Sequence, residues 1–183
     1  PKAALDPARA HIVECSYSVT PGTAVAIPLK HLIGENMDWD QWFAFHKELL
    51  ENREIQKICH NIAFESSFSY HLGIVIQAPV YDTMAASQMT QNSDYSFRRL
   101  SDSGLKTLSA ELLDEKRKTF SETTDGKHFD ELDPQDPTTI EYACDDADQA
   151  LQLMEIFNGW FDRFLPRHRW IVENLESPTA VYL

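Results

Sequence analysis

The sequence predicts an α/β protein in which helices pack on the faces of a mixed sheet. β-rich segments come first, and short strands then alternate with helical segments, an order typical of a sheet flanked by helices. The length of 183 residues suits one domain. An apolar content of 43% is enough for a substantial core.

The first half of the chain predicts a hairpin, a helix and a strand followed by a helix. Residues 11–19 partly alternate between apolar and polar side chains, and Thr20-Pro21-Gly22 follow as a turn. Asp38 is placed to cap the first helix. The expected elements are, in order, strands over 11–19 and 23–28, a helix over 39–52, a strand over 55–59 and a helix over 62–72.

The second half predicts mostly helix. Residues 92–104 are polar and turn-rich, and residues 114–137 are charged with two prolines near their end, so both segments are expected to be irregular. The expected elements are a short extended stretch over 79–82, helices over 83–89, 105–113 and 138–164, and a further helix from Trp170.

The charge of the chain limits how it could bind nucleic acid. The net charge is −13 and the pI is about 4.8, which excludes a broad basic surface for phosphates. Action on phosphodiesters would need metal ions to screen the acidic residues, or a basic neighbouring domain.

The cysteines and the hydropathy pattern indicate a reduced, cytoplasmic setting. Cys15, Cys59 and Cys144 lie far apart without paired spacing, so we expect free thiols with structural roles. No segment has the length and apolarity of a membrane span, and no signal peptide is visible. The chain starts with Pro1, which suggests a fragment.

The longest expected helix brings one aspartate to the border of the interior. With about 100° per residue, Asp146 lies roughly 60° from the centre of the apolar stripe, and Tyr142 precedes it by one turn. Asp145 and Asp148 lie more than about 130° from that centre and are expected to face water. The alternative for Asp146 is a capped or salt-bridged surface residue. The stripe consists of Ala143, Ala147, Ala150, Leu151, Met154 and Phe157.

A second carboxylate follows the strand over 55–59. Asn61 comes at the carboxyl end of that strand, where open α/β sheets bind ligands, and Glu65 lies one turn into the next helix. The alternative is that Asn61 caps the helix and Glu65 interacts with the helix dipole. Two carboxylates brought together at an interior border usually bind a divalent metal ion.

Two motifs stand out, residues 60–65 (HNIAFE) and residues 142–146 (YACDD). Four further stretches are residues 80–87 (VYDTMAAS), 104–109 (GLKTLS), 118–122 (KTFSE) and 145–153 (DDADQALQL). Taken in chain order, these six stretches resemble the proofreading 3′→5′ exonuclease domain of family A DNA polymerases, of the type with a catalytic tyrosine. Residues 173–178 (ENLESP) resemble the start of the polymerase portion.

The resemblance implies a ribonuclease H-like sheet with helices on both faces. Residues 1–169 would form the exonuclease domain, and residues 170–183 would begin a helix leading to a polymerase domain. The implied activity is removal of nucleotides from a single-stranded DNA 3′ end. Two Mg²⁺ or Mn²⁺ ions, about 4 Å apart, would support the reaction.

The same resemblance implies a role for each site residue. Asp146 and Glu65 would be metal ligands, with Glu65 where the family has an aspartate, and Tyr142 would orient the attacking water. Asn61 would position the substrate, and Phe120 would stack on the terminal nucleotide.

The chain departs from the family at its start. The family has a strand carrying Asp-x-Glu just before the region that matches Leu5-Asp6, and residues 1–5 do not contain it. The sheet is therefore expected to lack its first, central strand. Asp146 and Glu65 alone would leave two metal ions under-liganded. Two alternatives remain open: a catalytically inactive platform of a DNA polymerase, and an RNA-processing 3′→5′ exonuclease.

Overall fold

The computed structural model describes residues 6–91, 100–115 and 119–182. Its strands are β1 (Glu14–Thr20), β2 (Thr23–Pro28), β3 (Lys57–Cys59) and β4 (Val80–Asp82). Its longer helices are α1 (Trp39–Glu51), α2 (Ile62–His71), α3 (Thr83–Gln91), α4 (Leu105–Leu112) and α6 (Pro137–Phe164). Shorter helical elements are α5 (Phe120–Thr124), η2 (Phe129–Glu131), α7 (Pro166–Ile171), η3 (Val172–Glu176) and α8 (Ser177–Ala180).

The strands form two separate two-stranded sheets. β1 and β2 are an antiparallel hairpin with Glu14 opposite Pro28, whereas β3 and β4 are parallel with Cys59 opposite Asp82. No ladder joins the two sheets within the described ranges. The strand directions confirm the expected mixed α/β class, and the break between β1 and β3 lies where the resemblance implies a central strand.

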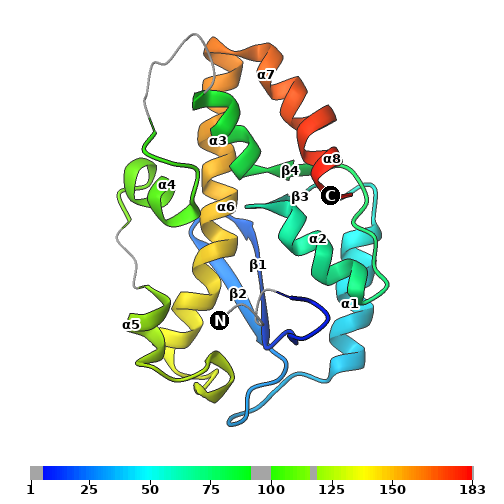
Figure 1. Ribbon diagram of the computed structural model, residues 1–183, viewed down its shortest axis with the longest axis vertical. Coiled ribbons are helices and arrows are strands. Elements are labelled where there is room, and N and C mark those ends of the chain that lie inside the picture. The colour runs from blue at the N-terminus through cyan, green and yellow to red at the C-terminus, as the bar shows by residue number, and fades with distance from the viewer. Residues whose placement is uncertain (1–5, 92–99, 116–118, 183) are drawn as a thin grey trace.

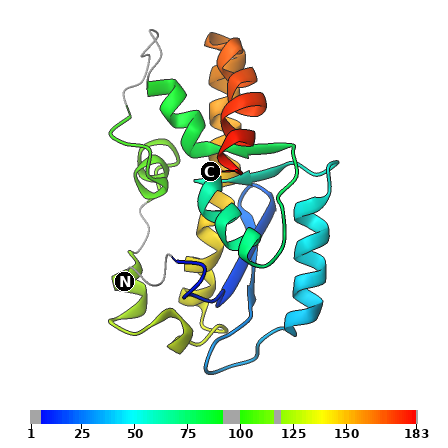
Figure 2. The ribbon, with the colours of Figure 1, turned by 45° about the vertical axis from the view of Figure 1, so that its right-hand side comes forward.

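Helix α6 is the axis on which the other elements pack. It contacts β1, β2 and β3 as well as α3, α4 and α7. In Figure 1, α4 and α5 lie to the left of α6, and α1 and α2 lie to the right beyond the strands. In the turned view of Figure 2, α1 again lies to the right of the strands, and α4 and α5 lie on the opposite side. Helices therefore cover both sides of the strands, as expected.

Two hydrophobic cores hold this arrangement together, and the C-terminal residues contribute to both. Val172 belongs to the first core and Val181 to the second. The first core is built mainly on α6 and includes Tyr81, Leu108, Leu153, Phe157 and Phe161. The second core lies under α1 and α2 and includes Leu50, Ile62, Ile74, Ile76 and Val80.

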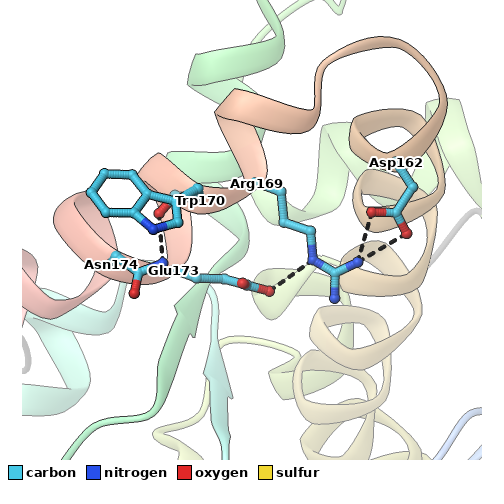
Figure 3. Close-up of polar contacts among 5 residues, drawn as sticks. All are labelled: Asp162, Arg169, Trp170, Glu173 and Asn174. Atoms are coloured by element: carbon cyan, nitrogen blue, oxygen red, sulfur yellow. Dashed lines mark hydrogen bonds and ion pairs between the residues drawn. The ribbon is translucent and has the colours of Figure 1, made fainter.

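An arginine ties the C-terminal segment to α6. The Arg169 Nη1 atom donates to both carboxylate oxygens of Asp162, at 2.8 and 2.9 Å, and its Nε atom donates to Glu173 at 3.0 Å (Figure 3). These side chains are partly exposed, so each ion pair contributes about 0–1 kcal/mol. The contacts fix the turn between α6 and the last helices rather than the core.

Most expected elements are confirmed within one to three residues of their predicted ends, and Asp38 caps α1 by accepting from the Gln41 N–H group at 3.0 Å. The segment 114–137 differs, because it contains α5 and η2 rather than only irregular chain. Thr119 and Glu122 form a reciprocal capping box that starts α5. The last helical region begins at Pro166 rather than Trp170, and much of the loop expected over 92–104 lies outside the described residues.

The helices were also compared with the dimensions of a bilayer. In the part of the chain that the structure describes, none combines the length and the apolarity needed to cross a membrane.

Candidate active site

The junction between β3 and α2 is held by a carboxylate from the neighbouring strand. The Asp82 side chain accepts from the N–H groups of Asn61 at 2.9 Å and Ile62 at 3.1 Å, and from that of Met84 at 2.9 Å. Asp82 therefore satisfies the first amides of both α2 and α3, which would otherwise be unpaired. The predicted capping role of the Asn61 side chain is replaced by this arrangement.

Asn61 is left with its side chain exposed at the start of α2. Its backbone is left-handed, with φ of 66°, and its side chain makes no capping hydrogen bond. Asparagine tolerates this conformation better than most residues. The amide therefore lies at the carboxyl end of β3, four residues before Glu65.

Glu65 and Asp146 lie within electrostatic range of each other; we call them the carboxylate pair. Glu65 lies in the first turn of α2, and Asp146 lies on α6. Both residues are exposed, yet surrounding protein raises the pKa of Glu65, and the charge of Asp146 raises it further. Glu65 is therefore influenced both by the protein packed around it and by a second carboxylate.

Tyr142 lies one turn before Asp146 on α6. Partial burial raises the pKa of its phenol, and the charge of Asp146 adds to the effect. The phenol therefore keeps its proton at neutral pH and can donate a hydrogen bond beside the carboxylate pair. Tyr142 and Asp146 lie one turn apart on α6, as their spacing predicts, and the roles of Tyr142, Asp146 and Glu65 stay predictions.

Three rings form an aromatic cluster next to the carboxylate pair: Phe120, Phe129 and Tyr142. The ring centroid of Tyr142 lies 6.2 Å from that of Phe120 and 5.9 Å from that of Phe129, and the two phenylalanines stack at 6.4 Å. Phe120 is 49% exposed, so its ring could still accept a base. The Lys106 ammonium lies 5.4 Å from the centroid of Tyr142.

Buried His31 contacts one ring of the aromatic cluster. The His31 ring lies 5.6 Å from Phe129. Its Nδ1–H group donates to the Leu132 carbonyl at 2.9 Å, and its Nε2 atom lies 3.5 Å from a carboxylate oxygen of Glu14. Burial raises the pKa of Glu14, and nearby His31 opposes that rise. The pair joins β1 to η2 and thereby fixes the position of Phe129.

Asp148 differs from its predicted position. It was expected to face water with Asp145, but it is only 8% exposed and accepts from the Gly22 N–H group at 2.8 Å and from the Gln152 Nε2 atom at 2.7 Å. Asp145 is partly exposed. The prediction for Asp148 is wrong because α6 packs against elements on several sides, and its second face meets the β1–β2 turn.

The three cysteines are unpaired, as expected. Burial raises the pKa of Cys15 to about 12 and that of Cys59 well above its usual value, and the charge of Glu65 contributes to both shifts. These thiols are therefore protonated at neutral pH and are poor nucleophiles. Because Glu65 influences a residue of β1 and one of β3, the carboxylate pair lies near the break between the two sheets.

The donor chemistry of the carboxylate pair suits Mg²⁺ or Mn²⁺. Both ions prefer carboxylate oxygens, and the mutual repulsion that raises the pKa of Glu65 would be relieved by a cation. No group of three or more potential ligands gathers among the described residues. Asp146 and Glu65 can therefore supply part of a metal site, but fewer carboxylates than a two-ion site uses.

The structure brings four of the five predicted site residues into contact or electrostatic range of one another: Glu65, Tyr142, Asp146 and Phe120. Asn61 is near Glu65 in sequence, and its role stays a prediction. Sequence reasoning missed Phe129 and Lys106. Lys106 lies inside the quoted stretch 104–109, whereas Phe129 lies in the segment expected to be irregular and gave no signal.

These features define a nuclease class, and comparison with known families agrees. A family model described as 3′-5′ exonuclease matches residues 2–159. The chain belongs to this 3′-5′ exonuclease family. The match supports the exonuclease part of the expectation, while the polymerase part gains no support from it.

The fold is similar to that of NrnC from Brucella melitensis. The structure of NrnC bound to pGG has a TM-score of 0.65 and 23% identity, and the match covers 98% of this chain and 79% of that one. NrnC with bound Mg²⁺ has a TM-score of 0.63 and 21% identity, with the same coverage. A structure described as the apo form of a nuclease has a TM-score of 0.64 and 20% identity, covering 97% and 78%. Identities this low show a shared fold.

Proposed function

We propose that this protein is a divalent-metal-dependent 3′→5′ exonuclease that shortens RNA, with short oligoribonucleotides as its substrates. The observation that carries the exonuclease chemistry is the placement of Tyr142 beside the carboxylate pair. Of the functions left open by the sequence, we therefore prefer RNA processing to proofreading in a DNA polymerase.

Each site residue has a distinct part in this proposal. Asp146 and Glu65 hold the divalent ion, which would offset charge on the reacting phosphate when bound. Tyr142, whose phenol keeps its proton, orients the attacking water. Phe120 takes the 3′-terminal base on its exposed ring, and Asn61 contacts the backbone of the substrate.

The carboxylate pair supplies fewer ligands than two divalent ions need. The family resemblance places an Asp-x-Glu strand at the centre of the sheet, and the two sheets described here are not joined by a ladder. Such a strand would complete the ligands and pair with both open edges.

The preference for RNA rests on the structural neighbours. The NrnC structures match nearly the whole chain, and one of them is bound to pGG. The resemblance of residues 173–178 to the start of a polymerase favours proofreading as the second candidate. The two candidates differ in the sugar and in the length of the substrate, so one experiment separates them.

The test compares 5′-labelled RNA and DNA of identical sequence, from two to about ten nucleotides, with Mg²⁺ or Mn²⁺. We expect stepwise loss of single nucleotides from the 3′ end, faster on the short RNA. Faster degradation of DNA would favour proofreading. No degradation of either substrate with either metal ion would favour the inactive platform.

Two variants on α6 test the assigned roles in the same assay. Asp146→Asn should abolish activity because it removes a charged metal ligand. Tyr142→Phe should reduce kcat by roughly 10- to 10³-fold, the range expected for losing one positioned hydrogen bond. Asp145→Asn, on the same turn, is the control and should retain activity. Equal losses in Asp145→Asn and Asp146→Asn would contradict the assignment of the helix face.

A further inference from the structure

We propose that Lys106 binds a phosphate oxygen at the 3′ end of the substrate, and is thus a further substrate-binding residue of this site. Lys106 is the second residue of α4, and its ammonium lies 5.4 Å from the centroid of the Tyr142 ring. Tyr142 in turn contacts Phe120 and lies within the field of Asp146. One tyrosine therefore adjoins a cation, an exposed aromatic ring and a carboxylate.

The other described cations with known contacts are engaged elsewhere. Among the residues in the described ranges, Lys106 is the cation that contacts a predicted site residue. The other contacts are Arg9 with Asp6, Lys30 over Trp39, Lys47 with Glu51, Arg53 with Gln77, Lys57 with two backbone carbonyls, Arg163 over Phe164, and Arg169 with Asp162 and Glu173.

A cation at this position offsets part of the negative charge around the site. The chain carries a net charge of −13, and the carboxylate pair repels an approaching phosphate chain. A lysine beside Tyr142 lowers that repulsion locally and binds phosphate as a point charge. Its contact with the ring limits the freedom of a long, exposed side chain, which reduces the entropy lost on binding.

This inference rests on the proposed function, and the experiment separates the two. Lys106→Met keeps the apolar stem over Tyr142 but removes the charge, and Lys106→Arg keeps the charge. Lys30→Met is the matched control, because the Lys30 ammonium also lies over an aromatic ring. It is 4.4 Å from the ring centroid of Trp39, the first residue of α1. The readouts are kcat and KM on a short oligoribonucleotide, and the salt dependence of its binding.

We expect Lys106→Met to raise KM by roughly 10-fold with kcat nearly unchanged, as for a contact made equally in the ground and transition states. The slope of log K against log salt should become shallower by about 0.7, the value for one phosphate contact on a single strand. Lys106→Arg should restore most of the KM, and Lys30→Met should match the parent protein.

Three results would overturn the inference. If Lys106→Met matches the active parent in KM and in salt slope, Lys106 does not contact the substrate, while the proposed function stands. If kcat falls and KM does not change, the lysine only holds the Tyr142 ring in place. If the parent protein neither binds nor cleaves the oligoribonucleotide, the proposed function fails, and the role of Lys106 fails with it.

Discussion

Glu65 shows how one side chain can be exposed and still carry a perturbed charge. Solvent reaches the residue, but protein around the carboxyl and the charge of Asp146 both disfavour its ionised form. Like charges held this close destabilise the protein unless a cation or a proton lies between them. We therefore interpret this repulsion as a destabilisation of the metal-free protein that a bound cation would relieve.

The raised pKa of Glu65 predicts opposite pH trends for the metal-free and metal-bound protein. Between the ordinary value of 4.5 and the raised value, the folded state binds more protons than the unfolded state. The contribution of Glu65 to the stability of the metal-free protein, measured against Glu65→Gln, should therefore fall as pH rises through that window. Stabilisation by Mn²⁺ should instead grow with pH, because the ion needs the ionised carboxylate.

Thermal unfolding with and without Mn²⁺, at pH 5 and at pH 8, measures both trends. Glu65→Gln should remove most of the gain from Mn²⁺ and should leave the metal-free protein no less stable at pH 8. An undiminished Mn²⁺ effect in Glu65→Gln would show that the ion binds elsewhere.

The sequence was most informative for residues that repeat at helical spacing. Tyr142 and Asp146 are one turn apart, so a correct helix placed both on one side, whereas Glu65 was assigned to the site only through the family resemblance. Phe129 could not be found in this way, because its place beside Tyr142 depends on the long-range contacts of His31 with Leu132 and Glu14.

At the scale of elements, α6 and the β1–β2 hairpin depend on each other through Asp148. Its carboxylate accepts the Gly22 N–H group in a turn where Gly22 has φ of 81°, a conformation that suits glycine. A helix that packs on one face can be oriented from its apolar stripe alone. α6 packs on several, so polar residues on its second face are buried as well.

Asp148→Ala should destabilise the protein by about 1–3 kcal/mol, because it removes the charged acceptor of the Gly22 N–H group. Asp148→Asn keeps an oxygen for the Gly22 N–H group and should cost less. Glu155→Ala, at an exposed position of the same helix, is the control and should stay within about 0.5 kcal/mol. Urea denaturation measures all three, and equal stability of Asp148→Ala and the parent would contradict this role.

At the scale of the whole molecule, the free energy of unfolding at acid pH should depend on buried His46. The Trp42 Nε1–H group donates to the Tyr17 hydroxyl at 2.9 Å, and that hydroxyl lies 2.8 Å from the His46 Nδ1 atom. His46 is 9% exposed, and burial lowers its pKa from 6.5 to about 4. The network therefore joins Trp42 and the neutral imidazole of His46, both on α1, to Tyr17 of β1.

The contribution of His46 to the stability of the fold should fall as pH drops from about 6.5 towards 4, because only the unfolded state then binds the His46 proton. The loss is at most roughly 3 kcal/mol, from about 1.4 kcal/mol per unit of pKa. Denaturant unfolding of the parent and of His46→Gln from pH 4 to pH 7 measures this contribution as the difference between the two curves. His11→Gln, at an exposed position, should follow the parent. The same pH dependence in His46→Gln and in the parent would contradict the prediction.

The order of strands and helices was predictable because it follows from local patterns. The pairing of β1 with β2 was predictable from the turn at Thr20-Pro21-Gly22, whereas β3 and β4 are paired through contacts distant in sequence. The position of α5 depended on the capping box of Thr119 and Glu122, a signal within a charged segment. The buried polar contacts of Asp148 and His46 required the packed structure, because neither residue is apolar.

Asp82 joins several elements at one carboxylate, and this has a consequence for how the protein opens locally. It receives the amides of Asn61, Ile62 and Met84, and its own N–H group donates to the Ser177 hydroxyl at 2.8 Å. These amides begin two different helices, yet they share one acceptor. Their hydrogen exchange should therefore be correlated, so that the chain segment carrying Asn61 and Glu65 becomes labelled together with the start of α3 rather than with the rest of α2.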